Sequence, residues 1–193
     1  IPVEAKTFHH DAYPMPNGNY LILTSDYRNI PNYYTSEVDE NAPRKTRKVM
    51  GDIIREFTPD GKVVWEWNTF NHLDPMRIGY ETFSRYWYNR GFPGVIDWSH
   101  ANSLFYDSTD NSVIVNFRYQ SALMKIDRES KKIRWIFGEP SGYADSLKKR
   151  IIQLNSGNWF WHQHGPTLTT HGTILLFDNS NYQARPFSEP TPP

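Results

Sequence analysis

The stretch Asp97-Trp98-Ser99-His100-Ala101-Asn102-Ser103-Leu104 opens a β-strand pattern that leads to Arg118, and the same pattern occurs earlier in the chain. His100 precedes Arg118 by the same number of positions as His10 precedes Arg28. In both segments the histidine comes before an apolar strand pattern. Such a match indicates an internal repeat of one β unit, and a repeat of this kind determines the fold class.

A third copy of the pattern begins in Trp161-His162-Gln163-His164-Gly165-Pro166. His164 precedes Gly172 by the same number of positions as His10 precedes Gly18, and Gly18 lies in an Asn-Gly hairpin signal. A histidine therefore recurs at a matching point in three units.

Apolar and polar residues alternate over short segments between turn signals, which is typical of antiparallel strands. The first strand is expected from residue 9 to the turn at residues 16–19, and the third unit opens with a strand from His164. The other expected strands are residues 20–24, 52–57, 62–67, 100–105, 112–117, 122–126, 132–137 and 174–179.

Four-stranded units that repeat at intervals of this length are typical of β-propeller blades. The sequence therefore predicts an all-β fold in which the chain supplies about two and a half blades. Residues 1–193 are interpreted as part of a single propeller domain, with a blade at about 9–68, an insertion at 70–96, a blade at about 97–138 and a partial blade at about 159–183. Because a closed propeller needs at least about four blades, further blades are expected upstream, downstream or both.

Three segments show no strand pattern. Residues 29–48 are polar and are expected to form a loop, whereas the insertion at 70–96 is rich in aromatic residues. Short helices are expected within that insertion at residues 76–88 and again at residues 144–152.

The composition shows no excess of positive or negative charge. It has 193 residues, of which 38% are hydrophobic and 22% are charged, and its formal net charge is zero. This length suffices for one buried core. The charge balance indicates neither a nucleic-acid nor an anionic membrane partner, and no apolar run is long enough to span a membrane.

Two further features concern the context of the chain. It contains no Cys, which excludes disulfides and thiolate metal sites. It begins at Ile1 without a signal peptide and ends in a Pro-rich stretch, so we expect it to be a piece of a longer protein or a processed form.

The repeat predicts that distant residues converge. The first strand of every propeller blade lines the central channel, so His10, His100 and His164 are expected to face one another across it. Asn102 lies two positions after His100 and therefore shares its strand face.

Imidazoles beside a guanidinium form a site for a compact oxyanion such as sulfate or phosphate. Arg118 offers a planar fork for two oxygens. A histidine is neutral and nucleophilic or cationic and acidic near neutral pH, so one imidazole could attack a sulfuryl group while the others stabilise and protonate the oxygens.

Metal binding is the competing chemistry. His162-Gln163-His164 places two imidazoles on one strand face, His9 and His10 add more ligands, and Asp11 and Asp97 neighbour the histidines. Arg118 would repel a cation in the same cluster, so the anion site is preferred and no metal is assigned.

The remaining histidines are interpreted as structural. His72 and His171 are expected to be turn residues, and His162 is expected to lie behind His164. The sequence contains neither a phosphate-binding loop for a nucleotide donor nor the nucleophile elbow of an acyl hydrolase.

In combination, several motifs resemble those of bacterial arylsulfate sulfotransferases, which do not use the nucleotide sulfate donor. The resemblance covers most of the chain, from about His9 to Asn179. The motifs are Asp97-Trp98-Ser99-His100-Ala101-Asn102-Ser103, Phe117-Arg118, Lys125-Ile126-Asp127, Trp135-Ile136-Phe137-Gly138, Gln163-His164 and Phe177-Asp178-Asn179.

The resemblance implies a six-bladed propeller that transfers a sulfuryl group between phenols by a ping-pong route through a sulfated histidine. His164 matches the histidine that becomes sulfated. His100, Asn102 and Arg118 match groups that bind the sulfuryl oxygens. The chain is much shorter than a complete enzyme of this family.

The resemblance does not decide between two adjacent histidines for one further role. His10, or alternatively His9, matches the residue that binds sulfate or handles the phenol's proton. It also implies an aryl sulfate donor, a phenol acceptor, no cofactor, a periplasmic or secreted location and a homodimer. The alternatives are a metal-dependent propeller hydrolase or lyase, and a non-catalytic segment that binds anions or a partner.

Overall fold

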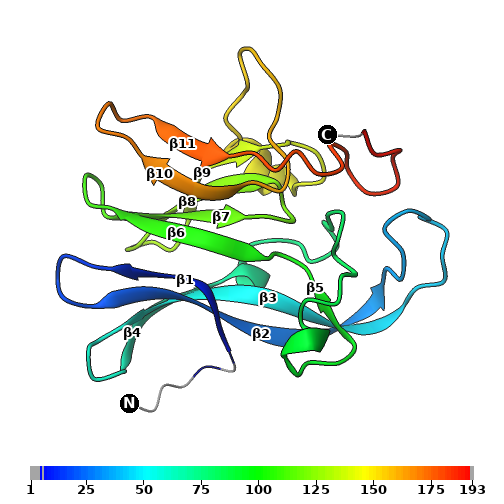
Figure 1. Ribbon diagram of the computed structural model, residues 1–193, viewed down its shortest axis with the longest axis horizontal. Helices are drawn as coiled ribbons and strands as arrows, with labels where there is room; N and C mark the ends of the chain where they lie inside the picture. The colour runs from blue at the N-terminus through cyan, green and yellow to red at the C-terminus, as the bar shows by residue number, and fades with distance from the viewer. Residues whose placement is uncertain (1–4, 6, 192–193) are drawn as a thin grey trace.

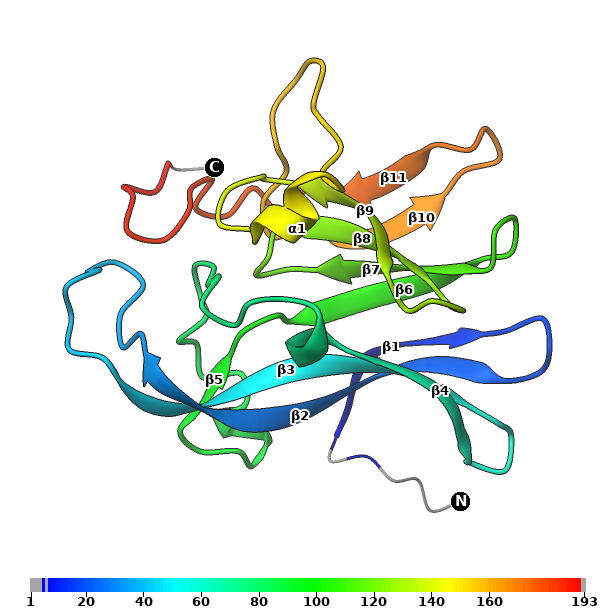
Figure 2. The same ribbon diagram turned by 180° about the vertical axis from the view of Figure 1, so that it is seen from behind.

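The computed structural model of the protein describes residue 5 and residues 7–191, which form three mainly antiparallel sheets with very little helix (Figures 1 and 2). The first sheet contains β1 (Phe8–Pro14), β2 (Tyr20–Tyr33), β3 (Lys45–Phe57) and β4 (Val63–Asn68) in chain order, with β5 (Val95–Asp97) paired to β3 in parallel. The second contains β6 (Ala101–Asp107), β7 (Ser112–Phe117), β8 (Ala122–Asp127) and β9 (Ile133–Gly138), also in chain order. The third contains β10 (His164–Leu168) and β11 (Ile174–Phe177). The predicted all-β class is confirmed.

The sheets are stacked so that their first strands lie together. Figures 1 and 2 show β6 between β1 and β10, and the contacts between these strands agree with both views. The Leu104 amide of β6 donates to Asp11 Oδ2 of β1 at 2.9 Å, which fixes the two sheets in register. No sheet closes on itself within the described residues, so propeller closure stays a prediction.

The predicted loop at residues 29–48 is shorter than expected. β2 continues to Tyr33 and β3 begins at Lys45, and the register pairs Asn29 with Lys48. The polar sequence concealed this extension because the pairing depends on the partner strand, while Tyr33 itself is fully buried.

The predicted helix at residues 76–88 is wrong. That segment consists of turns, flanked by short 3-10 helices η1 (Thr69–Asn71) and η2 (Tyr88–Arg90). The buried Arg77 guanidinium donates to the carbonyls of Gln120, Glu139 and Ser141. These long-range bonds hold the segment in its non-helical conformation.

Gly79 approaches the second sheet so closely that a Cβ there would lie 2.0 Å from Tyr119 O. This close approach sets the position of the turn segment against the turn between β7 and β8. In the other predicted helix, at residues 144–152, only α1 (Asp145–Lys148) forms.

The short strand β5 (Val95–Asp97) was not predicted. It pairs in parallel with β3, matching Lys48 with Val95 and Met50 with Asp97. Three residues are too few for a recognisable strand pattern. This strand carries the chain from the first sheet directly to His100.

One core joins the first two sheets, and tryptophans supply the links between them. The indole nitrogens of Trp65 and Trp67 donate to the carbonyls of Arg128 and Lys131 at 2.8 and 3.0 Å. The largest fully buried side chains include Trp67, Trp98, Tyr33, Phe117, Leu21, Leu23, Ile54, Ile114, Leu123 and Met124. The core therefore holds the starts of β1 and β6 in a fixed relation.

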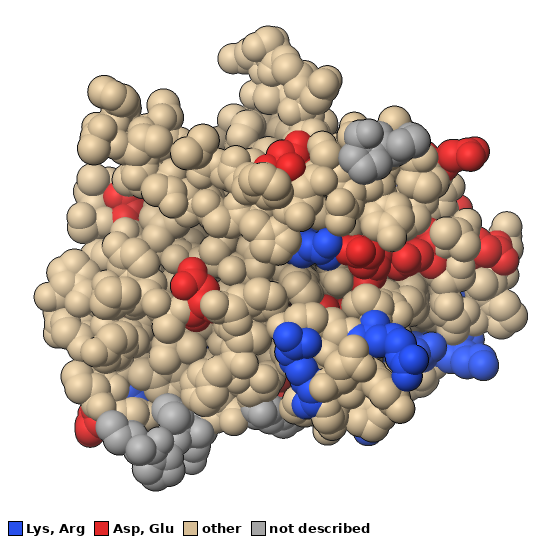
Figure 3. All heavy atoms as spheres, viewed as in Figure 1, with Lys and Arg blue, Asp and Glu red and all other residues tan. Residues whose placement is uncertain are grey.

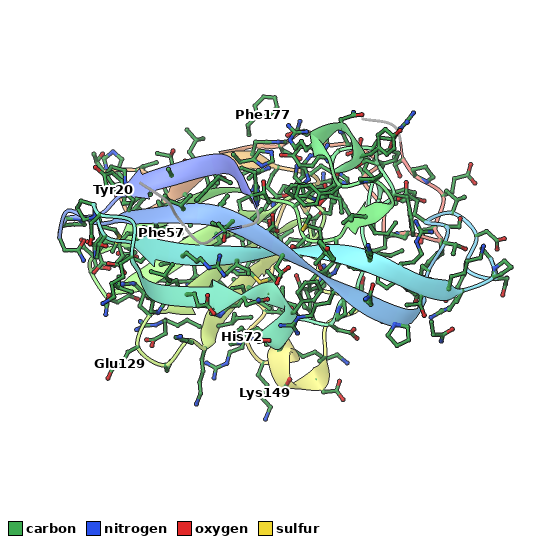
Figure 4. The ribbon with its side chains drawn as sticks, turned by 90° about the horizontal axis from the view of Figure 1, so that it is seen from below. Tyr20, Phe57, His72, Glu129, Lys149 and Phe177 are labelled. Carbon is green, nitrogen blue, oxygen red and sulfur yellow. The ribbon has the colours of Figure 1, made fainter. Side chains whose placement is uncertain are left out.

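The third sheet is a single hairpin whose outer strand is exposed. Leu175 and Phe177 are 67% and 68% exposed, and Figure 4 shows Phe177 pointing away from the sheets. Among the described residues, none of the helices has the length and apolar character needed to cross a membrane.

Candidate active site

The start of β1 brings two histidines into different surroundings. The His9 side chain is 2% exposed, its Nε2 lies 3.0 Å from Asp52 Oδ1, and its ring packs edge-on against Trp87. The His10 ring lies next to it, with 2.9 Å between the two Nδ1 atoms. His9 is therefore held inside the protein, whereas His10 is exposed.

Asp52 connects β3 with the residues around His100. Its Oδ2 accepts hydrogen bonds from Ser99 Oγ at 2.5 Å and from the Ala101 amide at 2.7 Å. Burial acts to raise the pKa of Asp52, but contacts with His9, Ser99 and Ala101 lower it overall. Burial likewise opposes ionisation of His9, but Asp52 outweighs burial and raises the pKa of His9.

His10 meets His100 from the second unit, as the repeat predicts. Their ring centroids are 4.9 Å apart, and Tyr86 stacks on His10 at 5.5 Å while lying edge-on to His100 at 4.6 Å. Partial burial, together with the neighbouring His100 and His9, lowers the pKa of His10 well below its usual range. The His10 ring is therefore neutral and can accept a proton.

His100 is oriented by a carboxylate from β5. Its Nδ1 lies 2.5 Å from Asp97 Oδ2, while Asp97 Oδ1 accepts a hydrogen bond from Trp87 Nε1 at 2.9 Å. The Tyr119 ring covers another side of His100 at 4.5 Å. Because a carboxylate fixes Nδ1, the Nε2 edge of the imidazole is the one left for chemistry.

The three units share a backbone feature beside these histidines. His10 and His100 have left-handed φ values of 56° and 47°, and His162 has a φ of 56°. Such values are uncommon outside glycine and indicate that the surrounding structure imposes the turn. In this respect the equivalent of His100 in the third unit is His162, two positions before His164.

Asn102 joins the second unit to the third. Its Nδ2 donates to the Gln163 carbonyl at 3.0 Å, and its Oδ1 accepts from Asn116 Nδ2 at 2.6 Å. Asn116 also donates to the Gln163 carbonyl at 2.8 Å and accepts from Gln163 Nε2 at 2.5 Å. The network fixes the backbone directly before His164, and a role of Asn102 in binding oxygens stays a prediction.

Arg118 is tied to His100 through the backbone and to a carboxylate through its side chain. The Arg118 amide donates to the His100 carbonyl at 3.0 Å. Its Nη1 forms an ion pair with Glu81 Oε2, which also lies 3.4 Å from His162 Nδ1. The guanidinium thus has a negative partner that the sequence did not reveal.

His164 lies at the start of β10 and is oriented by Asn179. Its Nδ1 is 2.6 Å from Asn179 Oδ1, an atom that can only accept, so Nδ1 carries the proton and Nε2 holds the lone pair. In the amide orientation that satisfies both of its groups, Asn181 accepts from Arg118 Nη2 at 3.3 Å and donates to the Asn179 carbonyl at 3.1 Å. Through these bonds His164 is linked to Arg118.

A groove of about 550 Å³ lies between β1, β6 and β10. Asp11 and Gly165 line it and directly follow His10 and His164 in the sequence, but neither histidine lines the groove. The other lining residues are Tyr13, Ser103, Leu104, Phe105, Tyr106, Pro166, Thr167 and Leu168. Figure 3 shows mostly uncharged residues on this face, with acidic and basic side chains side by side over the loops on the right.

The structure thus brings His9, His10 and His100 together directly, and the Arg118 amide bonds the His100 carbonyl. His164 reaches Arg118 only through Asn179 and Asn181, and Asn102 bonds the backbone of Gln163 before it. His72 stacks on Trp67 at 4.6 Å, and His171 is exposed in a turn, so neither belongs to the site. Within residue 5 and residues 7–191, no group of three or more His, Cys, Asp or Glu side chains is arranged to hold a metal ion.

The family profile described as Arylsulfotransferase (ASST) matches residues 1–191. The chain belongs to the arylsulfotransferase family. The arylsulfate sulfotransferase AssT of Escherichia coli O6:H1 is 22% identical over 216 residues, which cover 89% of this chain and 34% of that protein. The AssT of Lelliottia amnigena is 27% identical over 103 residues, which cover 44% of this chain and 17% of that protein.

This arylsulfotransferase chain therefore spans about a third of the length of the first of these relatives. Sequence reasoning noted Asp97 only as a neighbour of His100 and Asn179 only as part of a motif, and it missed Asp52 and Glu81. An acidic residue inside a predicted apolar strand, as at Asp52, was the one available signal. The pairing of Glu81 with Arg118 depends on the turn segment and had no local signal.

The His9–Asp52 pair yields a stability prediction. Asp52→Asn is expected to lower the free energy of unfolding by about 2–3 kcal/mol, because it leaves buried donors and His9 without their charged partner. The lowered pKa of Asp52 makes its contribution present above its unfolded pKa and lost as the pH falls. The raised pKa of His9 makes its contribution present at low pH and lost as the pH rises.

The difference in the free energy of unfolding between the unmodified chain and Asp52→Asn is therefore expected to be largest between about pH 4 and pH 6.5. Denaturant unfolding across this range measures it, with the exposed Asp60→Asn as the control. A difference that does not change with pH would show that the ion pair adds nothing beyond neutral hydrogen bonds.

Proposed function

We propose that this chain carries the sulfuryl-transfer site of an arylsulfate sulfotransferase, which moves a sulfuryl group from an aryl sulfate to a phenol. Family membership and the printed names of the two relatives support the activity. The observation that supports the site most strongly is the 4.9 Å approach of the His10 and His100 rings from two separate units.

In the proposed first step, His164 Nε2 attacks the sulfur of the donor. The N–S bond forms, the S–O bond to the aryl group breaks, and the aryl oxygen leaves as a phenolate that solvent then protonates. The hydrogen bond from Nδ1 to Asn179 leaves the lone pair on Nε2 and stabilises the positive charge that develops on the ring.

Arg118 and His100 are proposed to hold the sulfuryl oxygens, because a guanidinium and an oriented imidazole can both donate to them. Hydrogen bonds through Asn181 and Asn179 link Arg118 to His164. Asn102 holds the backbone of Gln163, directly before His164. It is also proposed to lie near the sulfuryl oxygens. No cofactor is assigned a role in this scheme.

His10 is proposed to take the proton of the acceptor phenol in the second step. The phenol oxygen then attacks the sulfur, the N–S bond breaks, and His164 is restored. The exposed ring of His10 favours it over His9, which is enclosed by Asp52 and Trp87. The aryl groups are proposed to lie in the groove along β1, β6 and β10.

The whole protein is proposed to be a six-bladed propeller, periplasmic or secreted and dimeric, as in the family that the motifs resemble. The two larger sheets, of five and four strands and stacked through their first strands, are consistent with blades of such a propeller.

Incubation with 4-nitrophenyl sulfate tests the function. The expected result is release of 4-nitrophenol that a second phenol accelerates, together with a protein form that has gained one sulfuryl group by intact mass. No release, or release that the second phenol does not change, would count against ping-pong transfer by this chain.

The role of Asn179 gives a further prediction. Asn179→Ala is expected to lower the rate of phenol release about tenfold, because His164 loses the partner that fixes its tautomer. Asn158→Ala, at an exposed loop position, serves as the control. Equal rates for the two variants would remove Asn179 from the mechanism.

A further inference from the structure

Glu81 places a carboxylate against the guanidinium of the proposed anion site. Its Oε2 pairs with Arg118 Nη1 and lies 3.4 Å from His162 Nδ1. The Glu81 backbone has a left-handed φ of 65°, which is unfavourable for a residue with a side chain. Next to it, buried Thr82 bonds through its hydroxyl to the Gly79 carbonyl at 2.7 Å, so the turn is fixed by its surroundings.

The charges at this point nearly balance. Contact with His162 and the charge of Arg118 lower the pKa of Glu81 to about 2 although burial opposes them, so its carboxylate is ionised. Burial lowers the pKa of His162, which is therefore neutral near pH 7. The charges of Arg118 and Glu81 therefore cancel, and the site offers hydrogen-bond donors without a net positive charge.

We propose that Glu81 sets the charge selectivity of the anion site, so that the site takes singly charged sulfate esters in preference to doubly charged phosphate esters. This inference rests on the proposed function, because it concerns the same site. The two esters share a tetrahedral shape and similar acceptor oxygens. They differ in charge, because a phosphate monoester loses its second proton near about pH 6.

The physical reason is short-range electrostatic repulsion between the Glu81 carboxylate and the bound anion. An oxyanion held by the free N–H groups of Arg118 lies within the span of one guanidinium from the Glu81 carboxylate. Each negative charge on the ligand is then repelled by that carboxylate, and a dianion is penalised more than a monoanion. Glu81 thus acts against the unwanted ligand, as in other sites that reject a close analogue.

The test measures binding of 4-nitrophenyl sulfate and 4-nitrophenyl phosphate to the full chain and to Glu81→Gln by calorimetry. Near about pH 8, where the phosphate ester is doubly charged, the variant is expected to improve phosphate-ester affinity relative to sulfate-ester affinity by about tenfold. Near about pH 5 the phosphate ester is singly charged, and the improvement is expected to disappear.

Other titratable groups near Glu81 do not produce this pattern. Burial raises the pKa values of Tyr119 and Tyr182, so both stay uncharged at these pH values. His162 is present in both proteins, and each variant is therefore compared with the unmodified chain at the same pH. Glu37→Gln is the matched control, since it removes a partly buried charge that faces Glu81 but is not paired with Arg118.

Three results would overturn the inference. One is an unchanged affinity ratio in Glu81→Gln at about pH 8. Another is an equal loss of affinity for both esters at both pH values, which would show a purely structural role. The third is a shift of equal size in Glu37→Gln. If Glu81→Gln does not fold, Glu81→Asn replaces it, because Asn tolerates a left-handed backbone.

The outcomes also separate this inference from the proposed function. Ester binding with the expected shift, but without phenol release, would support charge selectivity and count against sulfuryl transfer. Absence of binding of either ester to the unmodified chain would overturn both proposals.

Discussion

Replacing His164 with alanine is expected to lower the rate of aryl sulfate cleavage by at least about a thousandfold. The reason is that the variant lacks the only protein atom proposed to form a bond to sulfur, the Nε2 that Asn179 leaves unprotonated. Release of 4-nitrophenol from 4-nitrophenyl sulfate measures the rate. Intact-mass analysis is expected to show that the sulfuryl adduct is lost together with the activity.

His171→Ala is the matched control, because His171 is an exposed turn residue in the same hairpin. It is expected to keep both the rate and the adduct. If His164→Ala cleaves the ester at the rate of the unmodified chain, another residue is the nucleophile. If it retains the adduct on a different histidine, mass mapping of the peptides identifies that residue.

The sequence was most informative where local pattern and repeat agree. The strand at residues 112–117 was predicted with both ends correct, because its β-branched run lies between two polar turns. The repeat also predicted that His10 and His100 would approach each other, since equivalent positions on neighbouring units face the same space. Neither inference needed knowledge of side-chain partners.

The sequence was least informative where a contact depends on the path of an irregular segment. Arg77 holds the turns of residues 76–88 by bonds to carbonyls far along the chain, and no local pattern encodes them. Glu81 acquires Arg118 as its partner only because that path is fixed. Asp52 in the same way lies inside an ordinary strand pattern, and its role depends on Ser99 and Ala101.

The choice between His9 and His10 illustrates the same limit. Adjacent histidines in a strand face opposite sides, but the sequence does not say which side is enclosed. Burial of the His9 side chain against Asp52 leaves His10 as the ring available to a ligand. This geometry is the reason that the proposed mechanism assigns the phenol's proton to His10.

Arg118→Lys is expected to lower kcat/KM for the aryl sulfate about a hundredfold. The substitution keeps the positive charge and an ion pair with Glu81, but it removes the planar fork that is proposed to hold two sulfuryl oxygens. It also removes Nη2, which donates to Asn181, and so breaks the hydrogen-bond path from the cation to His164. Steady-state kinetics with 4-nitrophenyl sulfate measure the effect.

Arg28→Lys provides a control from the repeat itself. Arg28 holds the equivalent position in the first unit, where its guanidinium donates to Asn71 at 2.9 Å and lies over Phe70. Its replacement is expected to change kcat/KM by less than about twofold, since it contacts no residue of the proposed site. Equal losses of kcat/KM in Arg118→Lys and Arg28→Lys would mean that the arginine at this repeat position stabilises the fold and does not bind the substrate. A full rate in Arg118→Lys would mean that charge alone suffices and that the fork binds no sulfuryl oxygens.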